Sequence, residues 1–152
     1  MVPIFYGTDG EGIGHNISEF HDRFNQLCRE YLEAGRAKAF ALIFYHFSNI
    51  ELQQILENRG AFAQLDRLSG KQLSVFFLNS ESEPVTEYFN SHFQSKLGIA
   101  GEVSLPCVAF FKMVGDERKG LRIRPLNSPN TMHGFHELYS ILDAYIRTEI
   151  GS

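Results

Sequence analysis

The side chains best suited to nucleophilic chemistry in this sequence are its two cysteines, Cys28 and Cys107. They are far apart in the chain and form neither a CxxC pair nor a metal-binding spacing. A disulfide needs Cα atoms within about 7 Å of each other. We predict two free thiols, because one cysteine falls in a helical stretch and the other at the start of a strand. Cys28 lies on or beside an apolar helical face, where we expect an inert packing residue.

Cys107 directly follows Pro106 in the segment SLPCVAFF. A thiol becomes reactive when a cation or a helix N-terminus lowers its pKa, and this segment provides neither by itself. We therefore interpret Cys107 as a small residue that fills space at a strand start. The alternative is a reactive thiol that becomes oxidised or forms a mixed disulfide with glutathione.

Among the six histidines, His133 and His136 come nearest to a metal-ligand pair. Their three-residue spacing would place them on one face of a helix. No carboxylate or cysteine constellation accompanies them, however, and a metal site needs further ligands. We expect ordinary surface histidines, no metal ion and no cofactor.

A glycine-rich stretch, GTDGEGIGHN, separates a short strand from a helix. Backbone amides in such a loop can bind phosphate at a helix N-terminus. The glycine spacing matches neither GxGxxG nor the P-loop pattern, and Asp9 and Glu11 would repel an anion. The sequence favours a flexible loop that ends in a cap at Asn16 or Ser18.

The chain has 152 residues, 43% of them hydrophobic, and a formal net charge of -4. Since a chain of this size buries roughly 70% of its unfolded surface, we predict one domain over residues 1–152. A strand and the glycine-rich loop would occupy 1–16, and the core 17–150.

The charge shows no basic bias, so we expect no nucleic-acid partner. The chain starts without a basic, apolar leader and lacks the roughly 20 apolar residues that cross a bilayer, so we expect no membrane partner and a cytoplasmic location.

Arg118, Lys119, Arg122 and Arg124 form a local basic strip on an otherwise acidic chain. Such a strip could attract an acidic partner. Charges on an edge strand also prevent one sheet from pairing with another. We favour this second interpretation.

Hydrophobic periodicity predicts the elements that position these residues. Ser48 and Asn49 are placed to cap the second helix, and Gly60 marks a bend within it. The predicted order is β-α-β-α-β-α-β-β-α, an α/β fold with a mixed sheet of about five strands and about four flanking helices. The strands are expected at 3–6, 39–47, 73–79, 105–113 and 121–126, and the helices at 17–32, 49–68, 84–97 and 131–149.

In this order of elements the chain resembles the thioredoxin-like family over nearly its whole length. The buried strand ALIFYHF runs straight into a helix, and LPCVAFF occupies the place of that family's cis-proline and the following strand. The resemblance implies a thioredoxin-like fold and a cis bond between Leu105 and Pro106. It also puts Ile50 to Gln53 where the family carries its paired cysteines, and Phe44 near its buried acid. Residues 50 to 53 include no cysteine, and Phe44 is not an acid, so dithiol chemistry is excluded.

The resemblance leaves the groove beside the cis-proline as the usable feature. We predict a redox-inactive module for protein interaction or assembly, which binds a protein or peptide partner as an added strand. One wall of the groove is expected at Phe47, Ser48, Asn49 and Ile50, and the other at Leu105, Pro106 and Cys107. The alternative is a single-thiol or glutathione-dependent enzyme that uses Cys107 or Ser48. The partner's identity and the oligomeric state stay open.

Overall fold

The computed structural model describes residues 2–6, 13–15, 17–46, 48–79, 83–97, 105–114, 117–127 and 131–151. Strands and helices alternate along most of the described chain. The strands are β1 (Val2–Tyr6), β2 (Ile13–His15), β3 (Ala39–Phe44), β4 (Leu73–Asn79), β5 (Cys107–Val114) and β6 (Glu117–Pro125). The helices are α1 (Ile17–Glu33), α2 (Ile50–Glu57), α3 (Arg59–Ser69), α4 (Glu83–Lys96) and α5 (Thr131–Tyr145), which continues as the π-helix η1 (Ile146–Gly151).

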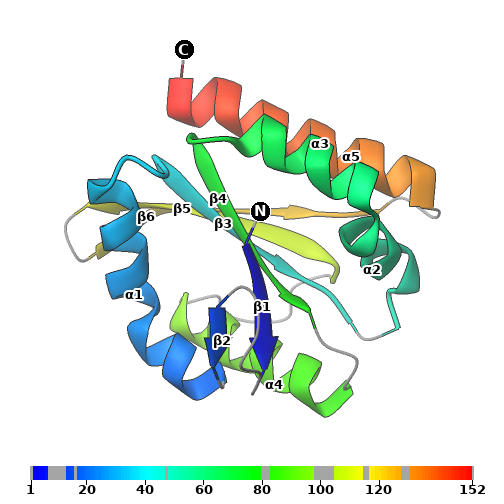
Figure 1. The fold of residues 1–152 in the computed structure, drawn as a ribbon, viewed down its shortest axis with the longest axis horizontal. Coiled ribbons are helices and arrows are strands. Elements are labelled where there is room, and N and C mark those ends of the chain that lie inside the picture. The colour runs from blue at the N-terminus through cyan, green and yellow to red at the C-terminus, as the bar shows by residue number, and fades with distance from the viewer. Residues whose placement is uncertain are drawn as a thin grey trace.

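The described strands form one open mixed sheet in the order β2-β1-β4-β3-β5-β6. β2, β1, β4 and β3 run parallel to one another, whereas β5 pairs antiparallel with both β3 and β6. Helices α3 and α5 lie over one face of the sheet, and α1 and α4 lie over the other (Figure 1). The prediction of an α/β fold with a mixed sheet between helices is therefore confirmed.

Two local expectations are corrected. Residues Ile13–His15, expected in a loop, form a short sixth strand parallel to β1. The other glycines of that loop and the predicted cap at Asn16 lie outside the described residues. The long second helix is interrupted at Asn58 and not at Gly60. The Asn58 side chain accepts a 2.9 Å hydrogen bond from the Ala61 backbone and so begins α3, because asparagine is a strong N-cap residue.

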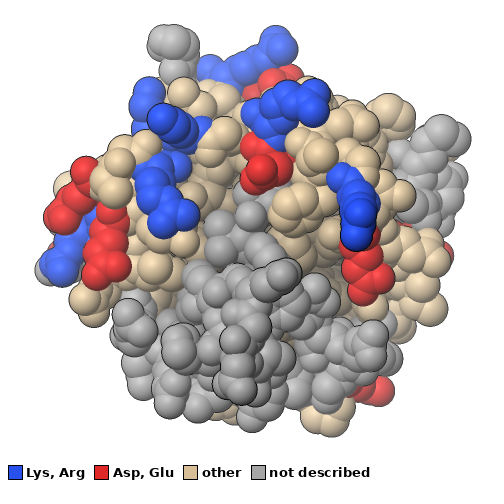
Figure 2. Space-filling view, viewed as in Figure 1, with Lys and Arg blue, Asp and Glu red and all other residues tan. Residues whose placement is uncertain are grey.

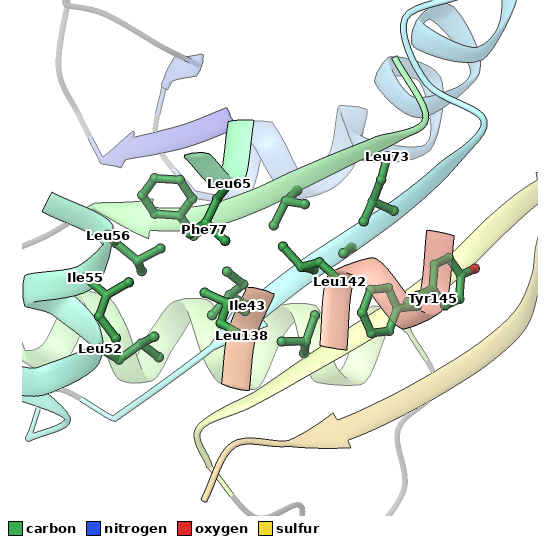
Figure 3. Packing of buried hydrophobic residues seen from close by; sticks show 14 of the residues in the cluster. Ile43, Leu52, Ile55, Leu56, Leu65, Leu73, Phe77, Leu138, Leu142 and Tyr145 are labelled. Atoms are coloured by element: carbon green, nitrogen blue, oxygen red, sulfur yellow. The ribbon is translucent and has the colours of Figure 1, made fainter. Parts of the chain in front are cut away.

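The sheet separates two hydrophobic cores, and residues of β3 alternate between them as a pleated strand requires. Phe40, Leu42 and Phe44 face α1 and α4, and we call this the α1/α4 core. Its counterpart, the α2/α3/α5 core, receives Ala39, Ala41 and Ile43. Figure 3 shows this second core, with side chains from α2, α3 and α5 packed on β3, β4 and β5.

Phe24 is the centre of the α1/α4 core. Its ring packs edge-on against Phe76, Phe93 and Phe111 at centroid distances of 5.4, 5.2 and 5.9 Å. Such edge-to-face contacts are favourable because the positive ring edge meets a negative ring face. One side chain of α1 thus contacts rings of β4, α4 and β5.

Strand β6 forms one edge of the sheet and contains a β-bulge. Phe110 pairs with Arg122 but Lys112 pairs with Lys119, so β6 holds one extra residue. Gly120 lies in this stretch with φ +67°, a conformation that glycine adopts at little cost. Bulges and charges at a sheet edge discourage pairing with another sheet.

Three basic residues of β6 have partners within the chain. Arg118 donates to the Asn25 side chain, the Lys119 ammonium lies 2.9 Å from a Glu117 oxygen, and the Arg122 guanidinium lies 3.2 Å from Glu149. In Figure 2, basic and acidic side chains of the described residues lie next to each other on the visible face. These contacts agree with the edge-strand interpretation of the basic strip.

Candidate functional site

The turn between β3 and α2 is held by buried hydrogen bonds. The Tyr45 hydroxyl donates to the Leu78 carbonyl at 2.6 Å, and the Asn90 amide donates to the Tyr45 carbonyl at 2.9 Å. Burial, and to a smaller extent the negative charge of Glu57, raises the pKa of Tyr45 to about 12. The hydroxyl therefore stays protonated as a donor, and the turn is fixed to both β4 and α4.

Asn49 shapes the next part of this turn. Its side-chain oxygen accepts a 2.7 Å hydrogen bond from the His46 backbone, and its own backbone N–H donates to the His46 carbonyl at 2.9 Å. Asn49 occupies the N-cap position of α2 but makes no capping side-chain bond. The prediction that the Asn49 side chain caps α2 is thus wrong, because its oxygen accepts the bond from His46 instead. Ser48 is exposed in the same turn.

The segment before β5 lies beside this turn. The bond between Leu105 and Pro106 is cis, the geometry that the resemblance implied. The Leu126 backbone donates to the Pro106 carbonyl at 2.9 Å, which extends the β5–β6 pairing by one step. In the described part of the chain, no hydrogen bond joins the backbone of Leu105 to another residue. The Leu105 side chain packs against the α1/α4 core.

A pocket of about 200 Å³ opens between the start of α2, the Pro106 turn, the segment after β6 and helix α5. Its floor and rim combine apolar side chains with amides and carboxylates. We call it the Pro106 pocket. Its lining residues are Asn49, Glu51, Leu52, Ile55, Pro106, Leu126, Asn127, Gly134 and Glu137.

The predicted groove residues are only partly brought together. Asn49 and Pro106, from the two predicted walls, line the Pro106 pocket. Ile50 follows Asn49 and leaves 58% of its surface exposed. Phe47 lies outside the described residues. The side chain of Cys107 is fully buried in the α1/α4 core, on the opposite side of the sheet from α2, so it does not form a groove wall.

Sequence reasoning missed the part of the pocket that comes from the C-terminal third of the chain. Leu126 and Asn127 follow β6, and Gly134 and Glu137 come from α5. One signal was available, because a glycine inside an apolar helical pattern often marks close packing. A Cβ atom at Gly134 would lie 3.0 Å from the Cδ1 atom of Ile55, so this glycine lets α5 approach α2.

Comparison with protein-family models, curated proteins and solved structures finds no match for this chain. Within the described ranges, His, Cys, Asp and Glu side chains form no group of three that could hold a metal ion. No helix among the described residues combines the length and apolar character needed to cross a membrane.

Both cysteines are free thiols, as predicted. Burial raises the pKa of the Cys107 thiol to about 11. Burial also raises the pKa of Cys28 well above its usual range, and the positive charge of Arg118 opposes this only in part. Since the thiolate is the nucleophile, the environment of each cysteine opposes thiol chemistry at neutral pH.

We expect Cys107 to react with a disulfide reagent at pH 8 at least about tenfold more slowly than N-acetylcysteine, because the smaller thiolate fraction outweighs the higher nucleophilicity of a basic thiolate. The measurement is the release of thionitrobenzoate from Ellman's reagent by the Cys28→Ala protein. The rate should keep rising with pH toward the pKa of about 11. The same protein unfolded in urea serves as the control and should react like the free thiol. A native rate equal to that of N-acetylcysteine would contradict the assigned burial.

Proposed function

We propose that the chain is a redox-inactive thioredoxin-like domain that binds an extended segment of a protein partner. The binding site is the Pro106 pocket together with the backbone of Leu105 and the exposed Ile50. The observation that carries the proposal is the meeting of Asn49 and Pro106 at one pocket. Residues from the two predicted walls thus contribute to one surface.

The element order supports the thioredoxin-like assignment. Apart from the short β2 and the division of the second helix into α2 and α3, the described elements follow the order on which the resemblance rests. The central strand β3 runs into α2, and the Pro106 turn leads into β5 beside it. These are the two places that form the binding groove in the proposal.

The backbone of Leu105 supports binding of an extended peptide. An added strand gains its affinity from main-chain hydrogen bonds and its specificity from pockets for alternate side chains. Leu105 has no backbone partner within the described ranges, and it directly precedes the Pro106 pocket. Ile50 adds an exposed apolar contact, with 58% of its surface accessible.

The single-thiol alternative receives no support from the site. Cys107 is fully buried on the other side of the sheet, and its pKa is raised to about 11 by desolvation. Ser48 is exposed in a turn, with no basic side chain bonded to it among the described contacts that would activate its hydroxyl.

The proposal is tested with peptides selected from a random heptapeptide display library on the wild-type protein. We expect Ile50→Arg to weaken the selected peptides about tenfold or more, because it replaces a central apolar contact by a charge. Affinities are measured by fluorescence anisotropy. Val114→Arg is the matched control, since Val114 is also an exposed apolar residue, at 63%, but lies at the far end of β5. Equal weakening by both variants, or by neither, would show that the peptides bind elsewhere.

A further inference from the structure

The two loops that precede β3 and β4 bring three cations together, at the opposite end of β3 from the Pro106 pocket. The backbone N–H groups of Lys38 and Ala39 both donate to the Gln72 carbonyl, at 2.9 and 3.1 Å. The loops therefore adjoin, and they carry the exposed side chains of Arg36, Lys38 and Lys71. We call these three residues the Arg36 cluster. Figure 2 shows basic side chains next to one another where α1 ends and β3 and β4 begin, at the upper left.

The end of α1 fixes the position of Arg36. Gly35 has φ +73°, and the backbone N–H groups of Gly35 and Arg36 donate to the carbonyls of Leu32 and Tyr31, at 3.2 and 2.9 Å. These two bonds form the Schellman motif, in which a glycine ends a helix. The Arg36 guanidinium lies over the Tyr31 ring, 4.0 Å from its centroid, which is a cation–π contact. Since Tyr31 stacks on Phe76, the guanidinium is supported by the α1/α4 core.

No carboxylate of the described residues forms an ion pair with the Arg36 cluster. Glu33 and Asp66 are the acids nearest to the cluster along the chain, and neither pairs with any of its three cations. Arg122 and Arg147, by contrast, each lie within 3.2 Å of a carboxylate oxygen. A guanidinium that lies flat on a ring keeps the N–H groups at its edge available. Such an edge binds a carboxylate through two parallel hydrogen bonds.

We propose that the Arg36 cluster docks an acidic segment of a partner protein, through the carboxylates of aspartate or glutamate side chains. The cluster and the Pro106 pocket lie at opposite ends of the six-residue β3, which is about 20 Å long, so this surface goes beyond the function proposed above. Three cations suit a short segment with two or three carboxylates. Nucleic acids and anionic bilayers require larger basic surfaces, and this chain has a net charge of -4.

The test uses a synthetic array of nonapeptides, probed with fluorescently labelled wild-type protein. The peptides carry two or three glutamates at every spacing on a glycine–serine background, and each has a counterpart with glutamine in place of glutamate. The ionic strength is about 0.15 M, at which exposed charges are largely screened beyond about 8 Å. We expect a subset of the glutamate spacings to bind and the glutamine counterparts not to bind.

Charge reversal at one residue then locates the binding surface. Lys71→Glu should weaken the selected peptides about three- to tenfold in fluorescence anisotropy, because an attractive contact becomes repulsive. Arg59→Glu is the matched control, since it changes the net charge equally and Arg59 is also exposed. Arg59 begins the eleven-residue α3, about 16 Å of helix away from the end that precedes Lys71. This variant should bind the peptides like the wild type.

Substitution of Tyr31 examines the support beneath the guanidinium. Tyr31→Leu removes the ring but leaves all three charges of the cluster, and it should weaken the peptides about two- to fivefold, because the guanidinium is no longer held in place. Tyr31→Phe keeps a ring and should bind like the wild type. Circular dichroism checks that both variants are folded. Unchanged binding by Tyr31→Leu would overturn the role given to the stacked guanidinium.

Four other results would overturn the docking surface. One is an array without a glutamate-dependent binder, and another is equal weakening by Lys71→Glu and Arg59→Glu. The third is a Lys71→Glu protein that is less stable but binds normally, because the cations would then only complement the negative ends of α1 and α3. The fourth is tighter binding, lost in Lys71→Glu, to a mixed-sequence RNA nonamer or to phosphatidylserine vesicles than to any peptide.

Discussion

Replacing Phe24 with alanine is expected to lower the free energy of unfolding by about 3–5 kcal/mol, the usual cost of truncating a buried phenylalanine. Phe24 is fully buried and touches Phe76, Phe93 and Phe111. Truncation leaves a cavity where α1 meets the sheet, and surrounding rings cannot close it without leaving their own contacts. Since natural domains are stable by only about 5–15 kcal/mol, this loss takes a large share of the total.

Urea denaturation followed by circular dichroism provides the measurement. Gln26→Ala on the same helix is the control, because Gln26 is exposed and the change should stay within about 0.5 kcal/mol. Phe24→Leu keeps most of the apolar volume and should fall between the two. If Phe24→Ala unfolded at the wild-type urea concentration, the central position assigned to this ring would be wrong.

Replacing Asn90 with alanine is expected to cost about 1–3 kcal/mol, because it leaves the buried Tyr45 carbonyl without its donor. Asn90 is only 5% exposed, and its amide donates to that carbonyl at 2.9 Å. The backbone at Tyr45 leads directly into the turn that positions Asn49. Loss of this bond should therefore loosen the candidate site as well as the fold.

Amide hydrogen exchange and urea denaturation together test this prediction. Ser91→Ala is the matched control, since Ser91 is the exposed neighbour in α4 and the change also introduces alanine into the helix. Exchange at residues 45–50 should accelerate in Asn90→Ala and stay unchanged in Ser91→Ala. Equal stability of the two variants would mean that the hydrogen bond contributes nothing measurable.

The sequence predicted the element order because apolar periodicity is a strong local signal. The prediction failed where a structure depends on very few residues or on pairing with a distant part of the chain. β2 has three residues, too few to show alternation, and it exists through pairing with β1. The helix break moved to Asn58 because a single capping bond to Ala61 decides it.

The candidate site was predictable where the resemblance fixed which strand ends meet, as for Asn49 and Pro106. The direction of Cys107 was not, because β5 is apolar on both faces and hydrophobicity cannot distinguish them. Val108 and Phe110 face one core, whereas Cys107 and Ala109 face the other. Glu137 was missed because its position at the Pro106 pocket depends on how the segment after β6 places α5.

The two faces of β3 differ in size as well as in direction. Phenylalanines and a leucine face α1 and α4, and two alanines and an isoleucine face the other helices. If β3 paired with its neighbours one residue out of step, the bulky and small side chains would exchange faces. One helical layer would then meet voids and the other would meet rings it cannot accommodate. The sequence of β3 thus disfavours a misfolded competitor through side-chain volume, even though both faces of the strand are apolar throughout.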